Sequence, residues 1–272
     1  MARNFNFTRR PEVVERDVLL TICPVPGHGG YMAAEVEQFD GSYRRQGCPK
    51  CLWEALNLAP IGSDARAQAA AMKRAERVNA LLVGSGISPR FRECTLENYR
   101  TDGGNAAMVT ALETCRQYVE RFEEHYAAGR CLLLLGNVGT GKTHLASAMA
   151  QALIRQHLAA AVITTAGEVI RVAKEAMDRK AGYTERDVLN ELAGFDLLVL
   201  DEVGAQAGTE YERGLLHEVI DRRYQSVLPT ILISNLCAAD LAKYIGDRAL
   251  DRLRQGGGLR AGFTWESLRR RA

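Results

Sequence analysis

The sequence lacks several features that would place it in a specialised class of protein. Its apolar stretches fall well short of the ~20 residues that span a bilayer, so no membrane partner is predicted. Lys and Arg total 35 against 33 Asp and Glu, which leaves a formal net charge of only +2 at pH 7. The chain therefore has no overall positive charge to attract nucleic acid. Any surface for nucleic acid must be local.

The seven cysteines do not suggest a disulfide framework. Their number is odd, and they are spread along a chain in which 47% of the residues are hydrophobic and can build a core. Charged side chains recur through residues 9–17, where an export signal would need an apolar run. We therefore expect the chain in the reducing cytoplasm.

A chain of 272 residues is long enough for one α/β domain of roughly 150 to 200 residues and a smaller module. Residues 17–53 combine short extended runs with Gly- and Pro-containing turns and three cysteines, which predicts a β-rich module over residues 1–60. Strong helix formers fill residues 65–83 and end at Gly84, which predicts a helical linker over residues 61–88.

Residues 89–272 have the alternating pattern of an α/β domain. An amphipathic helix is predicted over residues 105–126, from apolar positions at helical spacing opposite a charged face. Short apolar runs then alternate with helical stretches, as in a parallel sheet flanked by helices. The predicted strands are residues 131–136, 159–164, 196–202, 229–235 and 259–265.

The strongest motif follows the first of these strands. Residues 136–143 read GNVGTGKT, which fits the phosphate-binding pattern GxxxxGKT between a strand and a helix. Glycines let backbone amides curl around phosphate oxygens at a helix N-terminus. Lys142 would reach the β and γ phosphates and Thr143 would offer its hydroxyl to Mg²⁺, so ATP and Mg²⁺ are the predicted cofactors. The predicted nucleotide contacts are Gly136, Asn137, Val138, Gly139, Thr140, Gly141, Lys142, Thr143 and His144.

Two further strand ends carry the polar groups that nucleotide hydrolysis needs. Asp201 and Glu202 close the strand at 196–202, and ligands gather at the carboxyl ends of parallel strands. Asp201 is predicted to hold Mg²⁺ and Glu202 to polarise the attacking water; a solvated strand end is the alternative. Asn235 closes the next strand, where it would orient the water and sense the γ-phosphate, or merely cap the following helix.

Two arginines near the C-terminus are candidates for a group that acts on a neighbouring subunit's ATP. Arg248 and Arg252 lie four residues apart, and therefore on one helical face. An arginine supplied by a neighbour neutralises transition-state charge and makes hydrolysis depend on assembly. Arg252 is the first candidate and Arg248 the second. A local ion pair with Asp247 or Asp251 is the alternative.

Four soft ligands in two close pairs predict a structural zinc site. Four residues separate Cys23 from His28, and Cys48 and Cys51 form a CPKC motif. Three thiolates and an imidazole would complete a tetrahedron around Zn²⁺ with no open position for chemistry. A small β module buries too little apolar surface to be stable by its core alone, and a bound metal ion would stabilise it. Reduced, unpaired cysteines are the alternative.

Four segments of the chain resemble DnaC-type helicase loaders. They are GISPRFRECTLENYR, GNVGTGKTHLASAMA, LLVLDEVGAQAGTEYE and GDRALDRLRQGGGLRAGFTWESLRRR, all within residues 85–272. The resemblance implies an AAA+ ATPase whose subunits associate through their ATP sites, bind a hexameric replicative helicase and help to place it on single-stranded DNA. IstB-type proteins share the ATPase core, so an ATPase that assists a transposase is the alternative.

Two other classes fit fewer of the residues. A small-molecule kinase also uses a phosphate-binding loop but needs an acceptor pocket and a lid, and the Asp-Glu pair and the late arginines argue against it. A zinc-dependent adaptor with ATP as a structural ligand would show no turnover stimulated by single-stranded DNA.

The resemblance also implies where DNA is contacted. Thr209 and Tyr211 match positions associated with single-stranded DNA, and an aromatic ring can stack on any base. A nearby basic segment would track the phosphate backbone, although a charged helix face is usually only solvated. Its residues are Arg171, Lys174, Arg179 and Lys180. DnaI-like loaders carry a zinc-binding N-terminal unit that docks on the helicase, and the cysteine module is predicted to act in the same way.

Overall fold

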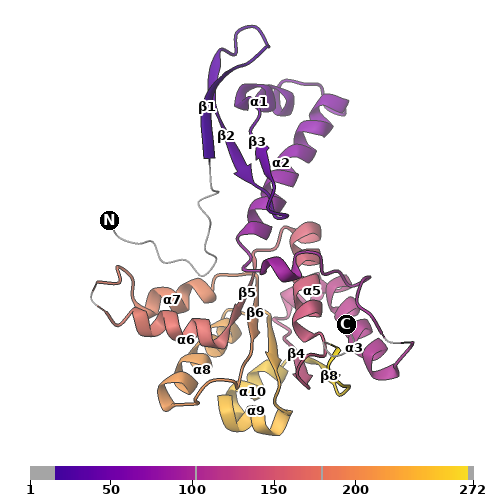
Figure 1. The fold of residues 1–272 in the computed structure, drawn as a ribbon, viewed down its shortest axis with the longest axis vertical. Coiled ribbons are helices and arrows are strands. Elements are labelled where there is room, and N and C mark those ends of the chain that lie inside the picture. The colour runs from indigo at the N-terminus through magenta and orange to yellow at the C-terminus, as the bar shows by residue number, and fades with distance from the viewer. Residues whose placement is uncertain (1–15, 102, 179, 269–272) are drawn as a thin grey trace. The chain divides into compact units, whose positions relative to one another are not determined.

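The computed structural model describes residues 16–101, 103–178 and 180–268, and the chain divides into two units between Gly84 and Ser85 (Figure 1). The smaller unit holds the cysteine-rich segment and the larger one the phosphate-binding motif. Among the helices of the described residues, none has the length and apolar character needed to cross a membrane. The predicted division into a module (1–60), a linker (61–88) and an ATPase domain (89–272) remains a prediction about which segments act independently.

The smaller unit contains a three-stranded antiparallel sheet, in the order β1-β2-β3, and two helices. Its elements are β1 (Arg16–Ile22), β2 (Gly30–Glu37), β3 (Tyr43–Arg45), α1 (Pro49–Asn57) and α2 (Asp64–Val83). Pro49 begins α1, at a helical position where the missing N–H costs no hydrogen bond. The CPKC motif therefore lies at the start of a helix. The β-rich module predicted over residues 1–60 thus also contains a helix, which the sequence pattern did not indicate.

The long helix α2 is attached to this sheet through one asparagine. Asn79 accepts a hydrogen bond from the backbone N–H of Phe39 at 2.9 Å and donates one to the carbonyl of Glu37 at 3.0 Å. At the other end of α2, the hydroxyl of Ser63 accepts from the N–H of Arg66 and caps the helix. These bonds make α2 part of the smaller unit.

The larger unit contains a five-stranded, fully parallel sheet in the order β5-β6-β7-β4-β8. Its strands are β4 (Leu132–Gly136), β5 (Ala161–Thr165), β6 (Leu197–Asp201), β7 (Thr230–Ser234) and β8 (Leu259–Phe263). Its helices are η1 (Pro89–Phe91), α3 (Ala106–Glu120), α4 (Phe122–Ala127), α5 (Lys142–His157), α6 (Ala166–Glu175), α7 (Glu185–Leu192), α8 (Glu210–Gln225), α9 (Ala238–Ile245) and α10 (Asp247–Arg254). The predicted α/β class and all five predicted strands are confirmed.

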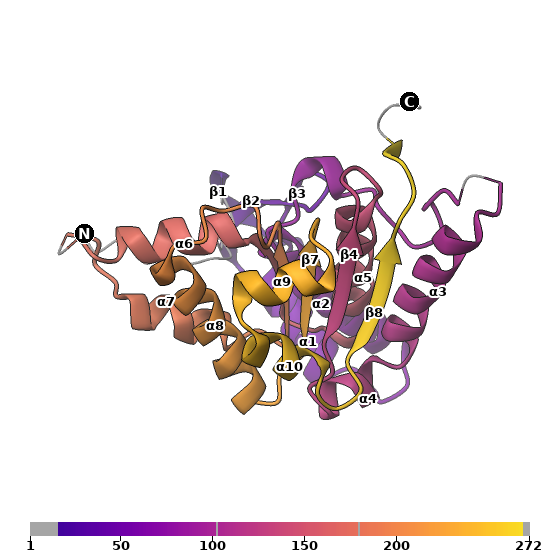
Figure 2. The ribbon, with the colours of Figure 1, turned by 90° about the horizontal axis from the view of Figure 1, so that it is seen from below.

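Helices cover both faces of this sheet (Figure 2). Leu133 and Leu135 of β4 point into a core that helices α6 to α10 share. Leu132 and Leu134 are equally buried and face the other way, because successive strand residues alternate between the two faces; α5 and α3 pack on that second side. A sheet buried on both faces needs apolar residues at every position, which explains the continuous apolar runs in the sequence.

The helix predicted over residues 105–126 is in fact two helices. The backbone leaves the helical region at Arg121, and α4 begins at Phe122. In this arrangement the ring of His125 stacks on Tyr118 with centroids 4.7 Å apart, and Phe122 is buried beside them. The helical periodicity of the sequence continues through this segment, so it does not reveal the break. The break is accompanied by packing of these rings, which belongs to the tertiary structure.

Candidate nucleotide and metal sites

The phosphate-binding loop connects β4 to α5, which begins at Lys142. Gly136 and Gly141 both adopt positive φ angles, 137° and 92°. A Cβ atom at Gly136 would lie 2.1 Å from the carbonyl oxygen of Phe263, and one at Gly141 would lie 2.6 Å from the ring of Tyr99. Both positions therefore require glycine for conformation and for space.

Lys142 and Thr143 lie at the start of α5 and both contact groups at the carboxyl edge of the sheet. The ammonium of Lys142 donates to the carbonyls of Gly136 at 2.8 Å and Asn137 at 2.6 Å. The hydroxyl of Thr143 donates to Asp201 Oδ2 at 2.8 Å. The two residues predicted to hold Mg²⁺ are thus in direct contact, although they are far apart in the sequence.

Asp201 is buried at the end of β6, with 7% of its surface exposed. Its Oδ1 accepts a hydrogen bond from the backbone N–H of Glu202 at 2.7 Å. Burial raises the pKa of Asp201, while the hydrogen bonds from Thr143 and Glu202 and the charge of Lys142 act in the opposite direction. A cation bound at this carboxylate would favour its ionised form further.

A pocket of about 380 Å³ lies over the loop. Glu202 and Asn235, which follow β6 and β7, both line it, and both side chains are exposed. The predicted nucleotide contacts that line it are Val138, Gly139, Thr140, Gly141, Lys142, Thr143 and His144. The pocket therefore brings together the loop and the two strand ends, as the parallel topology predicts.

Part of the pocket wall comes from residues 89–100, to which the motif analysis assigned no role. The lining residues from this segment are Arg90, Phe91, Asn98, Tyr99 and Arg100. Its position is determined by contacts with the loop and with α5: Tyr99 donates to the carbonyl of Thr140 at 2.8 Å, and Gln151 donates to the carbonyls of Phe91 and Cys94. These contacts join residues more than forty positions apart, so no local pattern could reveal them.

Residues 264–268, which follow β8, also contact the loop. Trp265 donates through its indole N–H to the carbonyl of Thr140 at 3.1 Å. The side chain of Asn137 donates to the carbonyls of Thr264 and Trp265, each at 3.1 Å, and the N–H of Leu268 donates to Gly139. The side chain of Asn137 is therefore bonded to the segment that follows β8.

The two candidate arginines differ in their surroundings. Arg252 forms an ion pair with Asp221 of α8 and contacts His217 Nε2 at 3.3 Å. The local partners considered from the sequence were Asp247 and Asp251, but the observed carboxylate comes from another helix. Arg248 is exposed and has no hydrogen bond or ion pair among the residues that the structure describes.

The residues proposed for DNA contact lie close together and already have partners within the chain. Thr209 caps α8 by accepting from the N–H of Glu212, whose carboxylate accepts in return from Thr209. Lys174 donates to the same carboxylate at 3.0 Å. Tyr211 donates to Glu185 at 2.7 Å and is half-buried.

The other basic residues of that segment differ in their surroundings. Arg171 is paired with Glu168 and Glu175, Lys180 is exposed, and Arg179 lies outside the described residues.

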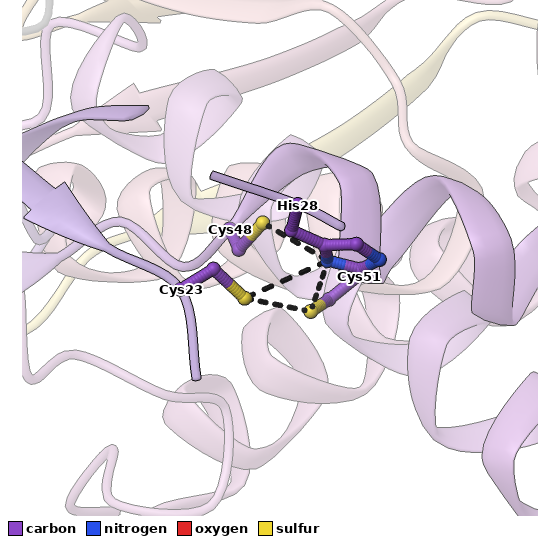
Figure 3. Close-up of side chains that lie close together, drawn as sticks. All are labelled: Cys23, His28, Cys48 and Cys51. Carbon is purple, nitrogen blue, oxygen red and sulfur yellow. Dashed lines mark hydrogen bonds between the residues drawn. The ribbon is translucent and has the colours of Figure 1, made fainter. Parts of the chain in front are cut away.

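Cys23, His28, Cys48 and Cys51 converge in the smaller unit (Figure 3). Their ligand atoms all lie within 4.8 Å of one another. Nδ1 of His28 lies 3.5, 3.6 and 3.2 Å from the sulfurs of Cys23, Cys48 and Cys51, and the sulfurs of Cys23 and Cys51 are 3.5 Å apart. A tetrahedron with Zn–S bonds of about 2.3 Å has S–S edges of about 3.8 Å, so the cluster could bind a metal such as zinc.

A fifth residue, which sequence reasoning missed, orients the imidazole. Glu54 of α1 lies 2.9 Å from Nε2 of His28, the nitrogen that faces away from the sulfurs. A carboxylate in this position holds a ligating histidine in the tautomer that exposes the other nitrogen to a metal. Glu54 follows Cys51 by three residues in a helix, so the spacing places both on one side of α1.

The thiols of this cluster have divergent pKa values. The backbone N–H of Cys51 helps to lower the pKa of Cys48 to about 7, whereas the contact between the sulfurs of Cys51 and Cys23, together with burial, raises the pKa of Cys51 to about 12. Three neighbouring thiolates repel one another, so a bound cation is needed for all three to ionise together. The donor set and its spacing fit such a cation.

Known proteins resemble this chain in sequence over most of its length. A family model described as IstB-like ATP binding protein matches residues 71–253. The replicative helicase loader DnaC of Escherichia coli (strain K12) is 35% identical over 198 residues, which cover 73% of this chain and 78% of that protein. The chain belongs to the DnaC/IstB family of AAA+ ATP-binding proteins. The matched family model begins after the Cys/His cluster, so it does not cover the candidate metal site.

Solved structures agree with the DnaC-like fold. The crystal structure of the DnaC helicase loader has a TM-score of 0.58 and 24% identity, over 65% of this chain and 99% of that one. The replication initiator DnaA, bound to AMPPCP and single-stranded DNA, has a TM-score of 0.53 and 23% identity, over 66% of this chain and 51% of that one. At these identities the likeness supports the AAA+ fold of the larger unit.

Proposed function

We propose that this DnaC/IstB-family chain binds and hydrolyses ATP with Mg²⁺ and uses it to load a replicative hexameric helicase onto single-stranded DNA. The observation that carries the proposal is the contact of Thr143 with Asp201 beside Lys142 and Glu202 in one pocket. The likeness to DnaC supplies the partner: that relative is named a replicative helicase loader.

In this proposal each pocket residue has one task. Lys142 would exchange its two carbonyl partners for phosphate oxygens, which is a stronger, charge-assisted interaction. Thr143 and Asp201 would hold Mg²⁺, which supplies charge neutralisation at the β and γ phosphates. Glu202 would polarise the attacking water and Asn235 would orient it, because both side chains are exposed at the pocket.

The test separates nucleotide binding from hydrolysis. Lys142→Ala is expected to weaken ATP binding by roughly 10- to 100-fold, since hydrogen bonds to a charged group contribute about 1.5–3 kcal/mol. Glu202→Gln is expected to retain ATP binding and lose turnover. Lys243→Ala is the matched control, because Lys243 is an exposed lysine paired with Asp240 of the same helix, α9, and does not line the pocket. Unchanged affinity in the Lys142 variant would remove the pocket from the proposal.

Hydrolysis is proposed to depend on self-association through the ATP sites. Arg252 would reach a neighbour only after leaving Asp221, whereas the exposed Arg248 needs no such release. Replacing each by Ala, and measuring turnover against protein concentration, tells the two apart. The residue that acts in trans is the one whose loss removes the concentration dependence while ATP affinity is retained.

Thr209, Tyr211 and Lys174 are proposed to contact single-stranded DNA. Lys174 and Thr209 both bond to Glu212, the residue that follows Tyr211, which supports a single site. The solved DnaA structure is described as bound to such DNA. DNA would have to replace the Lys174–Glu212 pair with a phosphate contact. Lys174→Ala combined with Tyr211→Ala is expected to weaken binding and to reduce its salt dependence. Equal affinity of the variant and the unchanged protein would exclude these residues.

The smaller unit is proposed to hold Zn²⁺ and to dock on the helicase. Its β1-β2 hairpin presents Leu20, Ile22 and Met32 as exposed apolar side chains on one face, because Leu20 pairs opposite Met32 and Ile22 lies two residues further along β1. Contiguous exposed apolar surface is typical of a protein interface. Leu20→Asp should abolish co-purification with the helicase, whereas Val109→Asp, at an exposed valine of α3, should not. Retained co-purification of the Leu20 variant would move the docking surface elsewhere.

An ATPase that assists a transposase is the second candidate, because the matched family model is described as IstB-like. The two functions differ in the protein partner and in the form of DNA that is bound, single-stranded or duplex. Co-purification with a hexameric helicase in the presence of ATP, and preference for single-stranded DNA, support the loader. Binding to a transposase on duplex DNA supports the alternative.

A further inference from the structure

The turn that follows β6 holds Glu202 in an unusual backbone conformation. Its φ angle is 57°, in the left-handed region that a residue with a Cβ atom rarely adopts. The chain bends sharply here, so Asp201 stays buried while the next side chain is exposed at the pocket. Such a conformation persists only when neighbouring contacts hold it.

The carboxamide of Gln206 supplies two of those contacts. Its Nε2 donates to the carbonyl of Glu202 at 2.9 Å, and its Oε1 accepts from the N–H of Gly204 at 3.2 Å. The N–H of Ala205 also donates to the carbonyl of Glu202, at 3.2 Å. One side chain thus bridges the turn and holds the peptide group of Glu202 in place.

A tyrosine from α9 holds Gln206 in turn. The hydroxyl of Tyr244 donates to Gln206 Oε1 at 3.0 Å. The ring of Tyr244 packs against Gly208, where an added Cβ atom would lie only 3.1 Å from it. On the opposite side of the turn, Ser234 of β7 donates to the carbonyl of Val203 at 2.5 Å. The turn is therefore fixed from α9 and from the strand that precedes Asn235.

Gln206 does not line the pocket, so its contacts with the turn at Glu202 are what connect it to the site. We propose that Gln206, anchored by Tyr244, is a positioning residue that keeps the carboxylate of Glu202 directed at the water it polarises. This inference rests on the proposed ATP hydrolysis at the same pocket. It assigns roles to two residues outside the phosphate-binding loop and the Asp-Glu pair.

The experiment compares two variants by single-turnover hydrolysis at saturating ATP and Mg²⁺ and by ATP binding. Gln206→Leu keeps the approximate size of the side chain and removes its three amide hydrogen bonds, with Glu202, Gly204 and Tyr244. Tyr244→Phe removes one hydroxyl and keeps the ring. We expect the hydrolysis rate to fall by about tenfold or more in Gln206→Leu and a few-fold in Tyr244→Phe, with the Kd for ATP within about twofold of the unchanged protein.

Tyr126→Phe is the matched control. Its hydroxyl donates to Asp196 at 3.1 Å, just before the start of β6 and away from the pocket-lining residues. This variant should leave hydrolysis unchanged. Because the two positioning residues act through one path, Gln206→Leu combined with Tyr244→Phe should be no slower than Gln206→Leu alone.

The outcomes separate the inference from the proposed function. If the unchanged protein hydrolyses no ATP, the proposed function fails and the role of Gln206 fails with it. If the unchanged protein hydrolyses ATP and Gln206→Leu does so at the same rate, only the inference is overturned. A parallel loss of ATP binding and hydrolysis would also overturn it, because a positioning role affects the chemical step alone. Tyr244→Phe decides the question if Gln206→Leu does not fold.

Discussion

The two units of the chain are stabilised by different means. In the larger unit, a buried apolar cluster extends from strands β4 to β7 through helices α6 to α10. In the smaller unit, the buried apolar residues among those described are only Cys23, Ala33, Ala34, Phe39, Ala69 and Leu82. Three of these six are alanines, which bury little surface. A small sheet with two helices cannot rely on its core alone, so we expect a metal bound by the Cys/His cluster to add stability.

The same contrast appears on the surface. Of the sixteen large hydrophobic side chains that are exposed among the described residues, ten belong to the smaller unit. A unit with this much exposed apolar surface is suited to bind a partner. The larger unit uses its apolar residues internally and keeps its polar groups at one edge of the sheet. These differences support the proposal that the smaller unit docks on a partner while the larger unit binds and hydrolyses ATP.

The largest expected effect is the loss of metal from the smaller unit. Binding of a structural Zn²⁺ contributes on the order of 10–16 kcal/mol to the folding of such modules. A chelator, or Cys51→Ser, should therefore remove hydrogen-exchange protection from residues 30–57 while residues 131–165 keep theirs. Cys237→Ser, at an exposed thiol, is the control. Full hydrogen-exchange protection of the smaller unit without metal would contradict the view that the two units are stabilised by different means.

A second effect tests the two cores. Leu200 of β6 is fully buried, whereas Leu20 of β1 is 71% exposed. Leu200→Ala should lower the free energy of unfolding of the larger unit by about 2–5 kcal/mol, because it leaves a cavity. Leu20→Ala should change stability by less than about 0.5 kcal/mol. Urea denaturation of both variants measures the difference, and similar losses would contradict the assigned surface role of β1.

A third, smaller effect concerns the orientation of the metal ligand. Glu54→Gln should weaken metal affinity by roughly 10- to 100-fold, because the histidine loses its charged hydrogen-bond partner while all four ligands remain. Competition with a chelating dye measures the affinity. Glu76→Gln, on the exposed surface of α2 in the same unit, is the control. An unchanged affinity would show that α1 does not hold the imidazole.

The smallest effect is expected at the buried carboxylate of the larger unit. Burial raises the pKa of Asp201 from its ordinary value of 3.8, so the folded protein binds the proton more tightly than the unfolded chain does. The stabilising contribution is complete below the unfolded pKa and is lost as pH rises through the higher folded pKa. In the absence of nucleotide and metal, Asp201→Asn should therefore raise the Tm at pH 7 by roughly 2 °C while ATP turnover is lost. Thermal unfolding across pH 3 to 7 checks the sign, and a lower Tm in the variant would contradict it.

Much of the larger unit is predictable because its signals are local. The five strands coincide with apolar runs, and Lys142, Thr143, Asp201 and Glu202 follow from motif spacing and from the rule that parallel strand ends share an edge. The prediction of a single helix over residues 105–126 was wrong, because the periodicity of the sequence does not show the break at Arg121. Ring packing around Tyr118 accompanies that break. The partner of Arg252 was missed for a similar reason, since Asp221 comes from another helix.

The order of residues along the chain, by itself, determined the α/β class, the phosphate-binding loop and the four soft ligands, because each depends on neighbours within a few residues or on a regular period. Only the tertiary structure decided that Tyr99 and Trp265 brace the loop, that Glu54 holds His28, and that Gln206 and Tyr244 secure the turn at Glu202. Those contacts arise where separate elements meet. Their geometry depends on how the helices pack on the sheets, which no local pattern encodes.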